Sequence, residues 1–242
     1  MIVRCDLHLH TDLSPCADPD MTPGNIVAMA ALKGLQAIAI TDHQSCGNCS
    51  AAMTIAERLG GPLVLPGLEV ESQEEIHLLC LFPDLAAASR MEARVRAAMP
   101  EFKNRRDIFG AQHYYNAEDE ICGEEDRLLL VACGIDCFEL ARLALDLGGV
   151  CLPAHVDREA NSMLATLGLI PPDFPTRWLE VSAAGDERRL LADHPELLDY
   201  RLLSNSDAHR LSDIAEPGWP LQVPDFSPDA DGRQKLILAL RP

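Results

Sequence analysis

The sequence predicts an α/β fold in which largely parallel strands are covered by helices. Short apolar runs with strand composition alternate with helical patterns along the chain. Alternation repeated this often implies parallel strands with covering helices, and in a closed arrangement the strand carboxyl ends converge on one face. Because no repeat, low-complexity tract or flexible linker divides the 242 residues, we expect one domain over residues 1–242.

The expected elements follow one another in a regular order. A helix should begin after Thr22, with Pro23 at its first position, and end near Gly34. A second helix start is marked by Asp136 and Glu139, which have capping-box spacing. Residues 102–125 are polar and fit the pattern poorly, so they are expected to form a loop excursion beside the site. The runs expected to form strands are residues 2–5, 37–40, 62–65, 76–82, 150–152, 178–181 and 202–203.

Composition and charge exclude several classes of protein. The 20 Lys and Arg residues face 38 Asp and Glu residues, which gives a formal net charge of −18 and argues against binding of long nucleic acids. The chain has the apolar and charged content of a globular protein. No secretory signal and no run long enough to span a bilayer are evident. The nine cysteines fall largely inside apolar runs, as reduced thiols do, and a cytoplasmic protein without a membrane partner is expected.

Histidines and carboxylates gather at the ends of the expected strands. Residues two apart on a strand face the same side, so His8 and His10 should share one space while Leu7 and Leu9 pack behind them. Six strand ends or strands carry such groups: His8 and His10, Asp42 and His43, Glu69, His77, His155, and Asp207 and His209. Imidazole and carboxylate are the ligands of Zn, Mn and Fe, and their convergence would be unfavourable without cations among them.

These motifs resemble the PHP (polymerase and histidinol phosphatase) domain family. The similar residues are His8-Leu9-His10, Thr41-Asp42-His43, Gly67-Leu68-Glu69, the strand histidines His77 and His155, and Asp207-Ala208-His209. The resemblance implies a distorted seven-stranded TIM-like (β/α)7 barrel, with two to three divalent ions at the carboxyl ends of the strands and phosphoester hydrolysis as the activity.

The resemblance also implies a ligand set. One metal would be held by His8, His10, Glu69 and Asp207, a second by Glu69, His77 and His155, and a third by His43 and His209. Glu69 would bridge the first two metals, although Glu71 would face the same side if the strand continues. Glu69, Asp207 and His209 are the expected catalytic residues.

The third metal site departs from the family pattern. Pro15 stands where an acidic ligand is usual, so Asp18 is the preferred replacement, with Cys16 and Asp20 as alternatives. Asp6 and Asp42 either orient ligand imidazoles or cap turns. The Cys46-x-x-Cys49 pair has no partner pair with comparable spacing, which favours incidental thiols over a zinc ribbon. His113 and His194 lack a strand-end context and are expected at the surface.

The function expected from this set is metal-dependent hydrolysis of a small phosphorylated metabolite or nucleotide by attack of a metal-activated hydroxide. Arg158, just past His155, is the best-placed cation for a substrate phosphate, although it could equally lie on a helix surface. Two alternatives stay open: a nuclease or proofreading-type phosphodiesterase, and a non-catalytic sensor or scaffold with bound metal.

Overall fold

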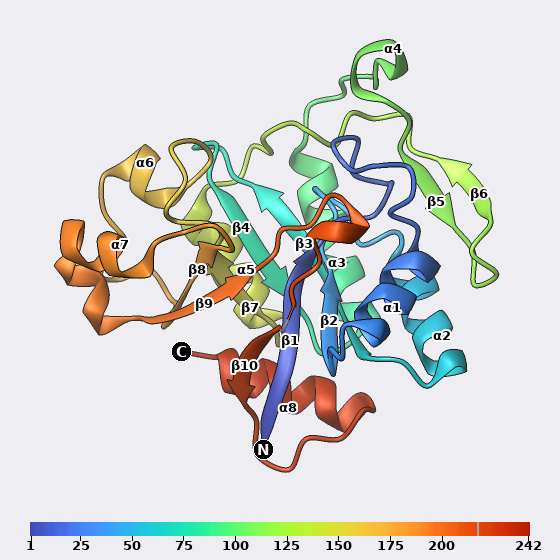
Figure 1. Cartoon of the computed structure of the whole chain (residues 1–242). Coiled ribbons are helices and arrows are strands. Elements are labelled where there is room, and N and C mark those ends of the chain that lie inside the picture. The colour runs from blue at the N-terminus through green and yellow to red at the C-terminus, as the bar shows by residue number, and fades with distance from the viewer. Residues whose placement is uncertain (217) are drawn as a thin grey trace.

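The computed structural model describes residues 1–216 and 218–242, and the expected alternation of strands and helices is present (Figure 1). The first half of the chain forms β1 (Ile2–Leu9), α1 (Pro23–Leu32), β2 (Ala37–Ile40), α2 (Cys49–Leu59), β3 (Leu63–Glu71), β4 (His77–Leu81) and α3 (Leu85–Ala98). The excursion then forms α4 (Arg106–Phe109), β5 (His113–Tyr115) and β6 (Ile121–Glu124). The remainder forms α5 (Cys137–Asp146), β7 (Val150–Pro153), α6 (Met163–Leu167), β8 (Trp178–Ser182), α7 (Glu187–Asp193), η1 (Pro195–Asp199), β9 (Arg201–Asn205), η2 (Leu211–Asp213), β10 (Trp219–Gln222) and α8 (Ala230–Leu240).

Both predicted helix starts are confirmed by their capping contacts. The Thr22 hydroxyl accepts a hydrogen bond from Asn25 N at 3.2 Å, and Pro23 opens α1. The Asp136 carboxylate accepts from Glu139 N at 2.9 Å at the start of α5. Each side chain satisfies a backbone N–H group that the first turn of a helix leaves without a partner.

The strands form a curled, open sheet. Six strands pair in the order β10-β1-β2-β3-β4-β7, and β8 and β9 form a separate parallel pair that lies between β7 and β1. At both seams between the two sheets, the described residues show no continuous ladder. Single contacts join them instead, including Val156 N to Glu180 O at 2.8 Å and His10 N to Ala208 O at 3.1 Å. The α/β class is therefore confirmed, whereas a closed seven-stranded ladder is not observed.

Of the strands predicted from the sequence, β4 runs against the expected direction, and β10, which was not predicted, is antiparallel to β1. β4 is antiparallel to both β3 and β7, because β3 and β4 are joined by a tight turn too short for a crossover helix. Ser72 N donates to Ile76 O in this turn, and Glu75 has a positive φ of 61°. The reversal places His77 at the amino-terminal end of its strand, so that it still reaches the rim where the parallel strands end.

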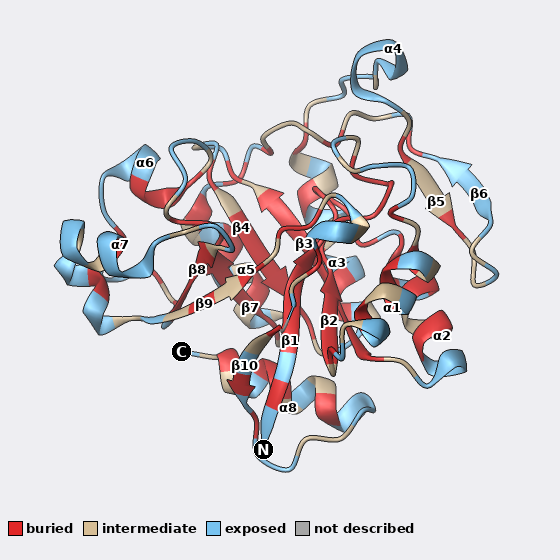
Figure 2. Ribbon diagram, in the orientation of Figure 1, coloured by how far each residue is buried: buried red, intermediate tan, exposed pale blue. Residues whose placement is uncertain are grey.

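Two hydrophobic cores follow from the alternation of side chains along the strands. Residues such as Ala37, Leu65 and Leu152 point into the curled sheet, where α8 contributes Leu236, while a second core fills the space between the sheet and the outer helices. Figure 2 shows β2, β3, β4 and β7 largely buried and the helices exposed on their outer sides. Figure 1 shows α8 lying across the end of the sheet at which β1 begins, opposite the rim that carries the histidines.

An irregularity in β1 corrects one sequence expectation. Leu9 packs in the outer core, as expected, but Leu7 belongs to the inner core together with Val3 and Cys5. The pairing of β1 with β2 shifts register between Asp6 and Leu9. Such an irregularity changes which face a side chain occupies, so that Leu7 and the adjacent His8 both point inward.

Residues 102–125 leave the sheet as a projecting segment made of α4 and the β5–β6 hairpin (Figure 1). The Asn48 side chain holds the hairpin: its Nδ2 donates to His113 O at 3.0 Å, and its Oδ1 accepts from Tyr115 N at 2.9 Å. Gly110 at the end of α4 lies against the Pro15 carbonyl. The segment therefore borders the loop that follows β1. None of the described helices is long and apolar enough to cross a membrane.

Candidate metal centre

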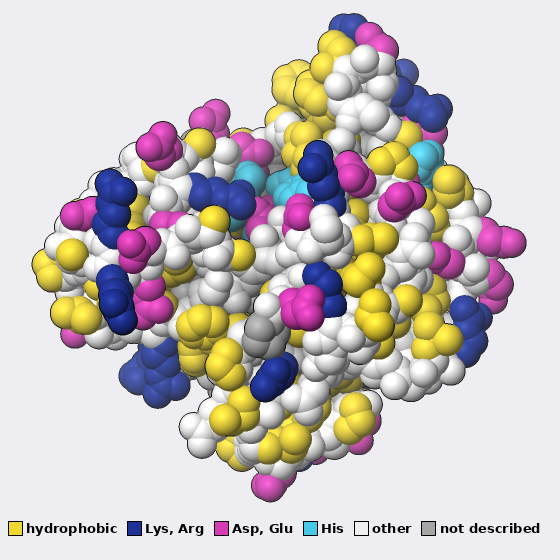
Figure 3. Space-filling view, in the orientation of Figure 1, with side chains coloured by type: hydrophobic (Ala, Val, Ile, Leu, Met, Phe, Trp, Pro, Cys, Tyr) yellow, Lys and Arg dark blue, Asp and Glu magenta, His cyan; other side chains and the backbone are white. Residues whose placement is uncertain are grey.

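Except for Asp18, the side chains predicted to bind metal lie together at one rim of the sheet, where Figure 3 shows histidines in a hollow between raised parts of the surface. All are buried except His77 and His209, which are half-buried. His155 apart, their potential ligand atoms form three overlapping groups, in each of which these atoms lie within 4.8 Å of one another. The groups are His8, His10, Glu69 and Asp207; His43, Glu69 and His77; and His10, His43 and His209.

The Glu69 carboxylate lies at the centre of the cluster. Its Oε1 is 2.9 Å from His77 Nδ1 and 3.1 Å from His155 Nε2. Its Oε2 is 3.1 Å from His43 Nδ1 and 3.4 Å from His10 Nε2. One carboxylate thus turns an oxygen toward each of two groups of imidazoles, which is the geometry of a bridging ligand. Glu71, the alternative, belongs to none of the three groups of described residues.

Hydrogen bonds fix the protonation of His10. The Ser14 hydroxyl donates its only proton to Asp42 Oδ1 at 2.7 Å, since a carboxylate only accepts. His10 Nδ1, at 3.0 Å from the same hydroxyl oxygen, must therefore donate to it. The lone pair of His10 consequently lies on Nε2 and points into the cluster.

His8 is oriented in the same way by a different partner. Its Nδ1 lies 3.0 Å and 2.9 Å from the two carboxylate oxygens of Glu180, so this nitrogen donates and Nε2 faces inward. His8 Nε2 and His10 Nε2 are then 3.1 Å apart, and Asp207 Oδ1 lies 3.2 Å and 3.1 Å from them. These acceptors cannot satisfy one another, and a cation or a proton must lie between them.

Two buried polar atoms at the site support a fit to metal ions. Asp207 Oδ1 and His155 Nδ1 have no hydrogen-bond partner among the described residues. Both belong to residue types that ligate Zn, Mn and Fe, and such atoms are rarely left unpaired in a folded protein. Asp207 and His155 also have positive φ angles of 50° and 31°, which are uncommon for non-glycine residues and occur often at functional sites.

The electrostatics of the cluster favour the protonation states in which these carboxylates and His10 can bind a metal ion. Burial opposes ionisation of Glu69, but the charges of His77 and His8 outweigh it and hold its pKa well below the usual value. The same balance, with His8 as the main favourable neighbour, lowers the pKa of Asp207. Burial lowers the pKa of His10 to about 4. At neutral pH both carboxylates are therefore charged and His10 is neutral.

His8 shows the opposite behaviour. Although burial opposes its protonation, the charges of Glu180 and Asp207 raise its pKa well above the usual value. Without a cation, a proton on His8 relieves the repulsion among the surrounding acceptors. Metal binding at this position would release that proton.

The third group contains only histidines. His209 Nδ1 donates to the Asp207 backbone oxygen at 2.8 Å, which leaves its Nε2 available, and the His10 and His209 rings stack with centroids 4.3 Å apart. The structure does not bring Asp18 into this group. Its backbone N donates to His209 O, but its exposed carboxylate lies 3.4 Å from Arg210 Nε. Asp18 as a metal ligand stays a prediction.

The two alternatives to Asp18 lie in the same loop. Asp20 is exposed and belongs to none of the three groups. Cys16 reaches the surface, but its thiol lies at a crowded part of the rim, where burial and the charge of Glu69 raise its pKa. A raised thiol pKa disfavours the thiolate that would ligate a metal.

Sequence reasoning missed Glu180 and Asn205. The Glu180 carboxylate, which is fully buried, accepts hydrogen bonds from His8 Nδ1, from His155 N at 3.0 Å and from Asn205 Nδ2 at 2.7 Å. Asn205 Oδ1 in turn accepts from Leu7 N at 2.8 Å. The available signal was a single Glu within the apolar run at residues 178–181, since a buried carboxylate needs partners.

Asp42 and Asp6 have different roles from each other. Asp42 acts on His10 through Ser14, as described above, and also accepts from Thr11 N and Oγ1. Asp6 has no hydrogen bond to an imidazole among the described residues. It accepts hydrogen bonds from Ser206 N and Oγ and from Ala215 N, and so anchors the loop that carries Asp207.

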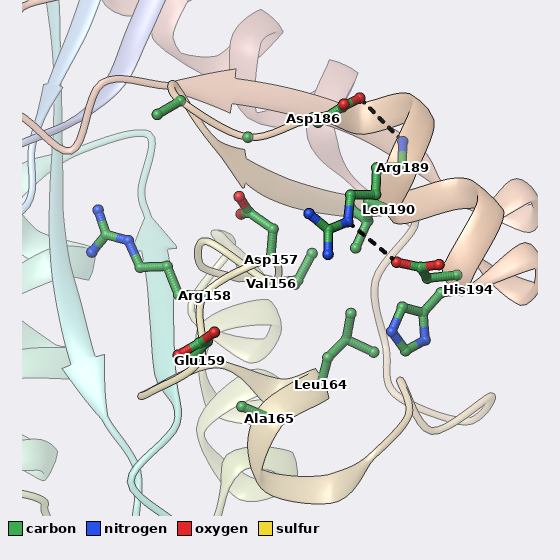
Figure 4. A pocket seen from close by; sticks show the side chains of 13 residues that line it. Val156, Asp157, Arg158, Glu159, Leu164, Ala165, Asp186, Arg189, Leu190 and His194 are labelled. Carbon is green, nitrogen blue, oxygen red and sulfur yellow. Dashed lines mark hydrogen bonds and ion pairs between the residues drawn. The ribbon is translucent and has the colours of Figure 1, made fainter.

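Arg158 reaches the cluster from the side. Its Nη1 lies 2.7 Å from Asp207 Oδ2, and its side chain is 45% exposed. It also lines a cavity of about 570 Å³ with an apolar floor of Leu164 and Leu190 and with Arg189 on the wall. In Figure 4 the Arg158 guanidinium points away from the other labelled side chains of this cavity. Arg158 therefore separates the cavity from the histidine cluster.

The remaining motifs lie outside the cluster. His113 Nδ1 contacts Asp12 Oδ2 at 2.6 Å, and His194 contacts Glu196 at 3.2 Å. Cys46 and Cys49 are buried free thiols and belong to none of the three groups of described residues. The interpretation of this Cys-x-x-Cys pair as incidental is consistent with that placement.

Comparison with known proteins supports the same family. No curated protein is significantly similar to the chain in sequence. Among solved structures, the lesion-specific endonuclease EndoQ from Pyrococcus furiosus is 20% identical with a TM-score of 0.61, and the match covers 98% of this chain and 56% of the endonuclease. The chain thus spans little more than half of that protein.

Two further structures match over most of their length. A protein assigned as a metal-dependent phosphoesterase from Bifidobacterium adolescentis is 19% identical with a TM-score of 0.58, and the match covers 98% of this chain and 96% of that one. An amidohydrolase from Chromobacterium violaceum is 18% identical with a TM-score of 0.59, and the match covers 92% of each chain. At these identities the likeness shows the fold. The model of the PHP domain matches residues 6–132, more than half of the sequence, and the chain belongs to the PHP domain family.

Proposed function

We propose that this chain is a metal-dependent phosphoric ester hydrolase that acts on a small phosphorylated metabolite or nucleotide. The observation that carries the proposal is the convergence of His8 Nε2, His10 Nε2, Asp207 Oδ1 and the Glu69 carboxylate on one buried space, where these atoms repel one another unless a cation or a proton lies between them. Two to three divalent ions, Zn, Mn or Fe, would supply Lewis-acid activation of water and of the ester when bound there. Membership of the PHP family agrees with this chemistry.

Residues of the chain account for the other requirements of the reaction. In the proposal, Glu69 would be a ligand of two ions and Asp207 a ligand of one of them. Asp207 Oδ2 also lies 2.7 Å from Arg158 Nη1 and so positions the guanidinium. The exposed side of Arg158 then contacts the phosphate, as guanidinium groups do in phosphate sites. The leaving group extends into the adjacent cavity of about 570 Å³, and the half-buried His209 is a ligand of the third ion.

The test compares Glu69→Gln with Glu71→Gln. Both changes remove one negative charge from β3, but only Glu69 belongs to the groups of potential ligands. We expect Glu69→Gln to lower turnover of a phosphomonoester by about 100-fold or more without loss of folding, because a neutral amide bridges two cations poorly. Glu71→Gln should stay within about threefold of the unaltered protein, because Glu71 acts on the cluster only through the weak interaction of a partly exposed charge. Near-normal turnover of Glu69→Gln with bound metal would exclude the bridging role.

A nuclease function is the second candidate. EndoQ has been solved with a 27-mer duplex that carries an abasic lesion at its active site, and this chain shares its fold at 20% identity over 87% of its length. The projecting segment also exposes Phe102 and Ile108 near Lys103, a combination that could contact a nucleic-acid strand. The net charge of −18 weighs against a long polymer.

Competition kinetics between a mononucleotide and an oligonucleotide of matched end chemistry separate the two candidates. A small ester meets mainly the local field of the bound cations, so the mononucleotide should be hydrolysed faster, and more so at low salt. Faster cleavage of the oligonucleotide, with tighter binding at low salt, would favour the nuclease. Absence of turnover for every ester by fully metal-loaded protein would instead favour a sensor or scaffold.

A further inference from the structure

A second cavity, of about 690 Å³, lies at the opposite end of the strands from the histidine cluster. Its walls come from the amino-terminal ends of β8 and β9 on one side and from β10 and α8 on the other. Figure 1 shows β9 and β10 separating at this end, and Figure 3 shows a hollow with hydrophobic side chains around it. Its volume is in the usual range for small-molecule sites.

The wall of this cavity is aromatic and apolar. The chain contains two tryptophans, and both Trp178 and Trp219 line it. Trp178 is buried, Trp219 is half-buried, and Leu238 from α8 is 55% exposed. Large apolar side chains that contact solvent inside a concave surface often indicate a ligand-binding site.

A cation stands beside the aromatic wall. The Arg201 guanidinium lies 5.5 Å from the ring centroid of Trp178, and no carboxylate of the described residues lies within ion-pair distance of it. Lys235, on the opposite wall, is already neutralised by Asp231 and also donates to Asp225 O at 2.6 Å. The Arg201 guanidinium is therefore free to pair with a group on a ligand. It favours a ligand that brings its own negative group.

An added peptide strand does not suit this space. β9 and β10 approach one another to within 8 Å between Cα atoms. A strand paired with both would need them about 9.6 Å apart, because paired strands are spaced by about 4.8 Å. A strand therefore cannot pair with both β9 and β10 where they lie this close together, whereas a flat small molecule needs no such pairing.

We propose that this cavity binds a small, flat, apolar molecule that carries one negative group. The ring system lies against Trp219, Trp178 and Leu238, and the anion contacts Arg201. This site is separate from the metal centre, since Trp178 and Arg201 begin the strands whose far ends lead to the histidine rim.

The test uses the indole N–H signals of the zinc-loaded protein in two-dimensional NMR, because the only two tryptophans both report on the cavity. Titration with 2-naphthoate should shift both signals to saturation, and the neutral analogue 2-naphthamide should bind about fivefold more weakly, as expected for loss of one partly exposed ion pair. An anion bound only at the metal centre would leave both signals in place and would overturn the proposal.

Two variants test the role of the cation. Arg201→Gln should reduce the preference for 2-naphthoate over 2-naphthamide to nearly one. Arg142→Gln is the matched control, since Arg142 lies 5.9 Å from the Phe138 ring in a comparable contact outside the cavity, and it should keep the preference. If both variants lost this preference equally, the assignment of Arg201 as the anion-binding group would be overturned. Indole signals that shift on dilution without ligand would show that a second copy covers this face, which would overturn the small-molecule occupant.

Discussion

Replacement of Glu180 by Gln tests how the site is held in place. The Glu180 carboxylate accepts from His8 Nδ1 with both oxygens, from Asn205 Nδ2 with Oε1 and from His155 N with Oε2. An amide keeps only one oxygen, so its NH2 group must face either Asn205 or the His155 backbone. Asn205 cannot adapt by rotating, because its own oxygen accepts from Leu7 N.

The expected cost follows from these contacts. Loss of one buried, charge-assisted hydrogen bond, together with a donor facing a donor, should lower the free energy of unfolding of the metal-free protein by about 2–3 kcal/mol. The His8 ring also loses the partner that directs its Nε2 inward. Affinity for zinc should therefore fall by about 10-fold to 100-fold, as is typical when an outer partner of a ligand histidine is removed.

Urea unfolding of metal-free protein and calorimetric titration with zinc measure the two effects separately. Glu187→Gln, an exposed change of the same kind on α7, is the control and should alter neither quantity. If Glu180→Gln bound zinc within twofold of the unaltered protein, the argument that Glu180 orients His8 for a cation would be refuted, whatever happened to the free energy of unfolding.

Three further predictions concern protonation, the third site and the thiols. His10 has a pKa of about 4 in the folded protein against an ordinary value of 6.5, so the metal-free protein should lose about 3 kcal/mol of stability from this group as the pH falls from 6.5 to 4. Urea unfolding across this range should show that contribution missing in His10→Asn. Asp18→Ala should lower metal stoichiometry at the third site alone, whereas unchanged stoichiometry, measured beside Cys16→Ala and Asp20→Ala, would return the role to those residues or to water. Of the nine free cysteines only Cys16 and Cys122 are exposed, and the raised pKa of Cys16 slows its reaction, so a thiol reagent should label Cys122 first, Cys16 more slowly and all nine only after unfolding.

The sequence predicted the site better than the details of the sheet. His8, His10, Glu69 and Asp207 could be placed together because each stands at the end of an apolar run, and strand ends meet at one rim. Strand direction leaves no mark on side-chain periodicity, so the reversal of β4 was not predictable from alternation. The irregularity that turns Leu7 inward arises from pairing with β2, which no local pattern reveals.

The residues that orient the expected metal ligands by hydrogen bonds were not predicted, for a related reason. Glu180 and Asn205 lie in strands whose composition is dominated by packing, and their importance depends on partners about 25 to 200 residues away. Distant hydrogen bonds of this kind are a property of the folded chain. The motifs in the first half of the chain, by contrast, can be recognised from residues that are adjacent in the sequence.

The two open seams of the sheet have a consequence for how the protein unfolds locally. Among the described strands β8 and β9 pair only with each other, and besides apolar packing their attachment to β1 and β7 includes polar groups at the site: Glu180 to His8 and His155, Asn205 to Leu7, and Asp6 to Ser206. Local opening of this pair would therefore dismantle the centre before the rest of the sheet is disturbed. A cation bound by side chains on both sides of a seam would hold the two sheets together. It would therefore slow amide exchange in β8 and β9 far more than in β2 and β3. Assembly of the centre and completion of the fold would then be one cooperative event.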